Sequence, residues 1–189
     1  MPGPDDFTPD AAVVVGTIGG RRIRVDFMHS ILGVDHHSLE NKFVTLTGTH
    51  RKTGGPIDIV VMHPLDCLRS RLSNINDLKR EDPHSINSAR ASIVILGAFV
   101  DDLLQEGMRK EAQATLHDLY FVIRGSCLGK IAFHKFGLDP RSILTDHLND
   151  SRLDVRWRKF NLASNIRRLA EREERLRSVS LRPSRGLLG

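Results

Sequence analysis

Hydrophobic and polar residues alternate along the first third of the chain, with the two-residue period of a β-strand that buries one face. The pair Gly19-Gly20 interrupts the first of these stretches, and adjacent glycines supply the positive φ angles that a tight hairpin turn needs. A second interruption, "HRKTGG", separates two further alternating stretches. The pattern therefore predicts four strands, over residues 11–18, 21–29, 41–49 and 56–63.

From Pro64 onward, hydrophobic residues recur with the period of an α-helix. Leu65, Leu68, Leu72 and Ile75 share one helical face, and Pro64 suits the first turn of that helix. Helices are expected over residues 64–78, 86–107, 108–125, 139–148 and 152–178, with a short helix or turn-helix within 126–137.

Strands followed by helices indicate an α+β fold, in which a small, mostly antiparallel sheet precedes a C-terminal helical bundle. We expect residues 1–64 to form the sheet region, residues 65–178 the helical region, and residues 179–189 a disordered tail. Aromatic residues make up only 5% of the chain, so the core is expected to be aliphatic.

Composition and motifs narrow the class of protein. The cysteines Cys67 and Cys127 form no spaced pattern, the nine histidines show no zinc-ligand spacing, and no P-loop is present. The longest apolar run, "ASIVILGAFV", is too short to cross a bilayer, and "MPGPDDFTPD" does not have the character of an export signal. We therefore expect a cytoplasmic protein with no membrane partner.

The net charge of +5 is concentrated at the C-terminal end. Residues 152–189 carry a net charge of +7, whereas residues 1–151 carry −2. Two interpretations follow: this segment faces nucleic acid, or it is a solvated helix face with a frayed tail. The residues expected to contact nucleic acid are Arg156, Arg158, Lys159, Arg167 and Arg168.

The spacing of these cations predicts how they are arranged. A helix completes a turn in about 3.6 residues, so cations at irregular intervals ring its exposed sides and form a diffuse positive surface rather than a shaped site. In the same run, Trp157 and Phe160 either stack on bases or pin the helix to the body of the protein.

One acidic residue, Asp26, stands in the middle of the strand "IRVDFMH". Strand alternation places it on the same face as Arg22 and Arg24, which is the arrangement of a solvent-facing residue. The alternative is that Asp26 belongs to a site.

Short motifs in a fixed order support that alternative. "VDF" contains Asp26, "IDIVVMHP" ends a strand, "PLDCLRSRL" opens a helix, "NINDLKR" continues it, and "INSARASIVI" follows. In this order the motifs resemble the nucleotidyltransferase-like proteins of the polymerase β superfamily, and in particular small bacterial members related to the abortive-infection toxins of toxin–antitoxin systems. The resemblance covers roughly residues 9–135.

The resemblance implies a nucleotidyltransferase that binds a nucleoside triphosphate and transfers a nucleotide to RNA or to an acceptor protein. In that family, carboxylates hold divalent metal ions, here expected to be Mg²⁺, on either side of an in-line transfer. Asp26 corresponds to the third carboxylate and is thus the expected catalytic and metal-binding residue. Arg71 and Lys79 are the expected nucleotide-binding residues.

The family's Gly-Ser element and its paired carboxylates belong before Asp26, and the 25 residues in that position contain neither. We therefore expect a chain that is N-terminally incomplete or diverged, with little or no nucleotidyl transfer. The alternative function is a non-catalytic module that binds nucleic acid or a protein through its basic C-terminal helix.

Overall fold

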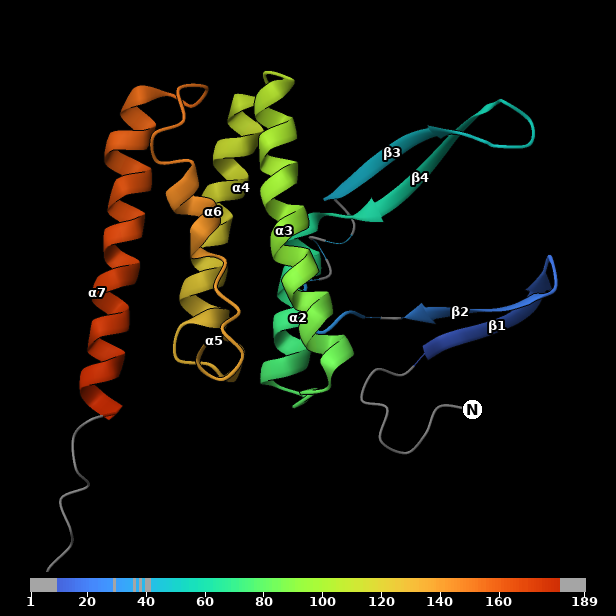
Figure 1. The fold of residues 1–189 in the computed structure, drawn as a ribbon, viewed down its shortest axis with the longest axis horizontal. Helices are drawn as coiled ribbons and strands as arrows, with labels where there is room; N and C mark the ends of the chain where they lie inside the picture. Colours follow the sequence, from blue (N-terminus) through green and yellow to red (C-terminus); the bar gives the residue numbers. More distant parts are fainter. Residues whose placement is uncertain (1–9, 29, 36, 38, 40–41, 181–189) are drawn as a thin grey trace, which may run out of the picture.

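The computed structural model describes residues 10–28, 30–35, 37, 39 and 42–180 (Figure 1). Two β-hairpins project from one flank of a helical bundle, and the last helix stands at the opposite flank (Figure 1). The predicted α+β fold class and the order of strands before helices are confirmed.

Each hairpin is a separate two-stranded antiparallel sheet. The first joins β1 (Asp10–Ile18) to β2 (Arg21–Met28), and the second joins β3 (Phe43–Thr49) to β4 (Pro56–Met62). The four predicted strands are confirmed, although the sequence suggested one sheet and the described residues form two. Each strand pairs with its neighbour in the chain across a short turn.

The segment between the hairpins crosses α2 (Pro64–Asn76) at close range. Gly33 has a φ of +78°, and a Cβ at this position would lie 2.3 Å from the Ser73 Oγ atom, so only glycine fits. Because the connection is seated on α2, β2 ends on one side of this contact and β3 begins on the other. The contact fixes one point of the connection between the two sheets on α2.

The helical region has six α-helices and two π-helical turns among the described residues. After α2 come α3 (Pro83–Gln105), α4 (Arg109–Val122), η1 (Ile123–Cys127), α5 (Ile131–His134), α6 (Arg141–Asp146), η2 (Trp157–Leu162) and α7 (Ala163–Ser180). No helix in this part of the chain combines the length and the apolar character needed to cross a membrane.

Side chains cap the first two helices. The His63 Nδ1 atom accepts a hydrogen bond from the Leu65 amide at 3.2 Å, and Pro64 occupies the first turn of α2. Asp82 accepts a hydrogen bond from the Ser85 amide at 3.0 Å and caps α3 in the same way. Both caps satisfy amides that have no partner within the helix.

The core is aliphatic, as expected from the composition. Leu65, Leu68, Leu72 and Ile75 of α2 are all buried, which confirms the helical face predicted from their spacing. They pack with leucines of α3, α4, α6 and α7, and Tyr120 is the one fully buried aromatic side chain among the described residues.

The helix predicted over residues 152–178 is present without a break over residues 155–180, although it begins later than predicted and contains a π-helical turn. The chain turns before Val155 and passes through the π-helical turn η2 before α7 begins at Ala163. A π-helical turn inserts an extra residue into the helical repeat and so rotates the faces that follow it. Residues 179 and 180, expected in the tail, belong to α7, and residues 181–189 lie outside the described residues.

Candidate functional site

Arginines from α7 and from the end of α4 surround a hollow of about 530 Å³. Arg168, Arg172 and Arg175 are spaced four and three residues apart, so they share one face of α7. Arg124, in η1, faces them from the neighbouring element. Tyr120 and Leu176 complete the lining. We refer to this hollow, with the four arginines and these two residues, as the arginine hollow.

The positive charge of the arginine hollow is not neutralised within the described residues. No acidic side chain lines it there, and Arg124, Arg168 and Arg172 make no ion pair in that part of the chain. The Arg172 Nε atom is buried and has no hydrogen-bond partner among the described atoms. A buried donor without an acceptor is costly, so the site favours a ligand that supplies oxygen atoms.

The buried acid of α7 is paired outside the arginine hollow. Glu173 is buried and forms ion pairs with Arg141 and with Arg177, the latter at 2.6 Å. Arg141 is bound in turn by Asp139 at 2.7 Å and lies over the Phe133 ring. The ion pair with Arg141 fastens α7 to the first residue of α6, and Glu173 is therefore not available to compensate the arginine hollow.

The position of α7 beside η1 also depends on a close contact. Gly129 follows η1, and a Cβ there would lie 3.2 Å from the Leu176 Cδ1 atom. The absence of a side chain at this position lets Leu176 approach the turn. The contact places the face of α7 that carries Arg172 and Arg175 beside Arg124.

The structure separates the five residues predicted to contact nucleic acid. Arg168 lines the arginine hollow, whereas Arg167 is exposed on the neighbouring face and lies 3.8 Å from Glu171. Arg156 and Lys159 are exposed, and Arg158 is half-buried with an Nε atom that lacks a partner in the described structure. The expected diffuse surface is therefore accompanied by a shaped hollow, which the sequence analysis did not foresee.

The sequence did not indicate Arg124, Arg172 or Arg175 as members of this site. The spacing of Arg168, Arg172 and Arg175, four and three residues apart, could have predicted that these arginines share one face of a helix. Arg124 had no such signal, because it lies on a different element and meets α7 through packing alone. The two aromatic residues of the basic run differ in their environment. Trp157 packs against the core, whereas Phe160 is 70% exposed.

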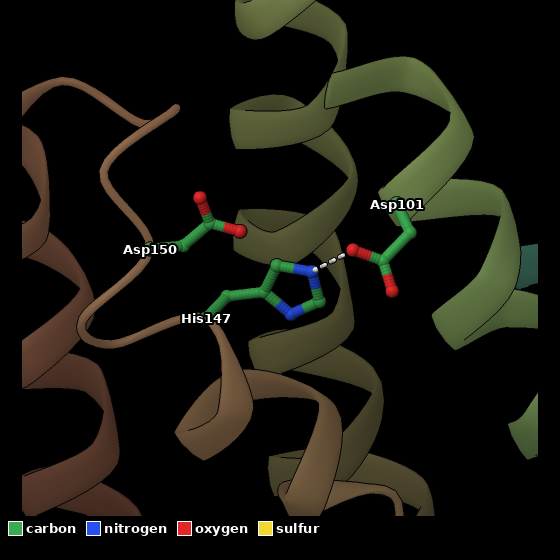
Figure 2. A group of neighbouring side chains, drawn as sticks. All are labelled: Asp101, His147 and Asp150. Atoms are coloured by element: carbon green, nitrogen blue, oxygen red, sulfur yellow. Dashed lines mark ion pairs between the residues drawn. The ribbon is translucent and has the colours of Figure 1, made fainter. Parts of the chain in front are cut away.

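A second cluster contains groups that could ligate a metal ion. Figure 2 shows Asp101 from α3 facing His147 and Asp150 from the segment after α6. One ligand atom of each residue lies within 4.8 Å of the others. The His147 Nδ1 atom donates to the Ile143 carbonyl at 2.7 Å, which leaves Nε2 facing Asp101 at 3.6 Å.

An arginine already balances the charge of this cluster. Arg152 donates from one nitrogen to Asp101 and to Asp150, in both cases at 2.6 Å. These hydrogen bonds lower the pKa of the Asp150 carboxyl. The Arg152 guanidinium lies between the two carboxylates, where a metal cation would otherwise bind. In addition, one imidazole and two carboxylates form a ligand set that suits transition metals better than Mg²⁺. The cluster therefore fits an internal ion-pair network better than a metal centre.

The residues predicted to form a nucleotidyltransferase site lie on different elements of the structure. Asp26 lies in β2, where its backbone pairs with Val13, and its side chain lies outside the described residues. Arg71 is exposed on α2 beside β3 and β4, and Lys79 follows α2 with a φ of 56° and donates to the Asn76 carbonyl. The nucleotidyltransferase activity, its Mg²⁺ and its triphosphate stay predictions.

Comparison of the chain with family models, with curated proteins and with solved structures returned no match.

Proposed function

We propose that this chain is a nucleic-acid-binding module that holds the phosphate backbone in the arginine hollow. The observation that carries the proposal is the convergence of four arginines on one hollow, with no acid in its lining among the described residues and with the Arg172 Nε atom buried without a partner. Guanidinium groups bind phosphate oxygens with two parallel hydrogen bonds, and several of them around one hollow match a polyanion.

Positive charge beyond the hollow favours a polymer over a single small anion. Arg156, Lys159 and Arg167 are exposed on η2 and α7. Phe160 lies among them and is largely exposed, as an aromatic platform for an unpaired base would be. A strand that enters the arginine hollow therefore finds further cations along the same helical segment. Under this proposal the protein acts in the cytoplasm, where it meets RNA or DNA.

The proposal is tested by fluorescence anisotropy with a labelled single-stranded RNA and with DNA of the same length. Arg172→Gln is expected to weaken binding of both and to reduce the slope of log K against log salt by about 1, because one phosphate contact is lost. The matched control is Arg109→Gln, which removes an exposed arginine at the far end of α4. Equal affinities for the two variants would refute the arginine hollow as the binding site.

A further inference from the structure

Large hydrophobic side chains are exposed together on one flank of the molecule. Among the described residues, twelve large hydrophobic side chains are exposed, and seven of them belong to the second hairpin or to α3. Val94 and Ile95, in the middle of α3, are 71% and 56% exposed. Leu46, Ile57 and Ile59 lie on one face of the second hairpin, whereas Phe43 and Val60 lie on its other face. A patch of this kind on a soluble domain marks an interaction surface.

The hairpin and α3 form the two walls of an open cleft. The register of β3 with β4 places Val44 opposite Val61 and Leu46 opposite Ile59, so one face of the hairpin is apolar. A hollow of about 570 Å³ separates this face from α3 and is lined mainly by apolar side chains of both. Figure 1 shows the second hairpin extending away from α3.

Contacts at its base hold the hairpin in this open position. Lys42, just before β3, forms an ion pair with Asp118 of α4 at 3.0 Å. His63, just after β4, packs edge-on against Phe99 of α3 with 5.0 Å between the ring centroids. A two-stranded hairpin is at best marginally stable alone, so the apolar face of this one needs a partner surface.

We propose that a second copy of the chain fills the cleft and forms a two-fold symmetric dimer. In this dimer, α3 packs antiparallel against α3 of the other copy, and each hairpin closes its apolar face over the partner's helix. The arrangement covers the apolar face of the hairpin, the cleft wall that contains Ile95, and Val94, which is exposed beside that wall. Closed two-fold dimers bury the same patch on both subunits, so the patch must be complementary to itself.

The exposed stripe of α3 meets that requirement. When two copies of α3 run antiparallel about Val94 and Ile95, Val94 of one copy lies opposite Ile95 of the other. Ala91 then lies opposite Ala98, and two small residues let the helices approach closely. Asn87 lies opposite Asp102, so an amide donor faces a carboxylate. The pairing brings no like charges together along this stripe.

The charges of the hairpin loop also favour a second copy. Arg51 and Lys52 are exposed at the tip of the second hairpin. Both ends of α3 carry exposed acids, with Asp82 at the start and Asp102 and Glu106 at the end. A hairpin that lies along the partner's α3 therefore brings its basic tip toward an acidic helix end. Because both ends of α3 are acidic, this electrostatic match adds attraction to the apolar contact without selecting the direction of the partner's helix.

The mass of the full chain in solution tests the proposal, by light scattering after size-exclusion chromatography across a range of concentrations. The wild type is expected to have twice the chain mass of 21.2 kDa. Val94→Glu is expected to give the mass of one chain, whereas the matched control Val155→Glu, at a residue exposed near η2, leaves the dimer intact. A wild type that is monomeric at all concentrations overturns the proposal. Such a result would also be expected if another protein, rather than a second copy, fills the cleft.

A second variant keeps the test valid if Val94→Glu fails to fold. Ile59→Thr removes an apolar contact from the hairpin face but retains a residue that favours strands. It is expected to shift the dimer toward monomer at lower concentrations, with an unchanged circular dichroism spectrum. A dimer unaffected by both variants would place the interface elsewhere. The arginine hollow is lined largely by α7, which stands at the flank opposite the hairpins (Figure 1), so nucleic-acid binding and dimer formation are measured independently.

Discussion

Arg152 and Asp101 are 51 residues apart in the chain, and their side chains meet at 2.6 Å. This ion pair fastens the segment after α6 to α3, since Arg152 also binds Asp150, its near neighbour. His147 lies buried beneath the cluster and contributes a contact to Asp101. The cluster joins two parts of the bundle that the sequence does not relate.

Removing the guanidinium is expected to lower stability. Arg152→Gln leaves two carboxylates without their shared partner, and we expect a loss of about 1–2 kcal/mol because both groups keep some contact with water. Urea unfolding measures the change. A matched control is Arg90→Gln on α3, whose side chain makes only exposed hydrogen bonds. Equal unfolding midpoints for the two variants would contradict the role of the cluster.

The same cluster predicts a pH dependence. Arg152 lowers the folded-state pKa of Asp150, so the stabilisation is present above the unfolded pKa of about 3.9 and is lost as the pH falls through the folded value. We expect the unfolding free energy of the wild type to fall below about pH 4 more steeply than that of Arg152→Gln. Parallel acid profiles for the two proteins would show that the ion pair contributes no pH-linked stability.

Metal addition separates an ion-pair network from a metal centre. Because Arg152 supplies the positive charge between Asp101 and Asp150, neither Mg²⁺ nor Zn²⁺ is expected to raise the Tm of the wild type. Chelation with EDTA is likewise expected to leave the Tm unchanged. A rise with Zn²⁺ that disappears in Asp150→Asn would identify the cluster as a metal site instead.

Asn76 is expected to be a strong determinant of stability. Its amide nitrogen donates to the Ser126 carbonyl at 2.7 Å, and its amide oxygen accepts from the Ala132 amide at 3.0 Å. Asn76→Ala leaves both backbone groups without partners, and we expect a loss of about 2–3 kcal/mol in urea unfolding. Asn161→Ala, at an exposed position of η2, should cost far less. Similar losses would mean that water replaces the Asn76 contacts.

Nucleic-acid binding by the arginine hollow is expected to depend steeply on salt. Four phosphate contacts predict a loss of affinity of about 10²-fold when salt rises from about 50 to about 200 mM, because counterions are released on binding. Deletion of residues 152–189 should abolish binding, because it removes three of the four arginines. Binding that survives the deletion would move the site to another part of the chain.

The chain is expected to show little or no nucleotidyl transfer. The sequence lacks the carboxylate pair that the polymerase β superfamily uses beside the residue corresponding to Asp26, and Mg²⁺ would lose most of its ligands. Incubation with labelled nucleoside triphosphates, Mg²⁺ and total RNA tests this prediction. Incorporation of label that Asp26→Asn abolishes would establish the enzyme and displace the binding-module proposal.

The sequence alone determined the secondary structure and the character of the core. Local signals suffice for these features, because strand and helix periods, the Gly19-Gly20 turn and the position of Pro64 act within a few residues. Gly19 and Gly20 both have the positive φ predicted for them, and the leucine stripe of α2 is buried. The basic character of the last helix was also evident from composition.

Only the tertiary structure decided which faces meet. A helical period predicts that Arg168, Arg172 and Arg175 share a face, but not that this face lies beside Arg124, since that contact depends on how α7 docks through Leu176 and Glu173. The π-helical turn η2 rotates the faces that follow it, and a one-residue insertion of this kind leaves no periodic trace in the sequence. Side-chain packing between elements distant in the chain therefore created the arginine hollow, the Arg152 cluster and the open cleft beside α3.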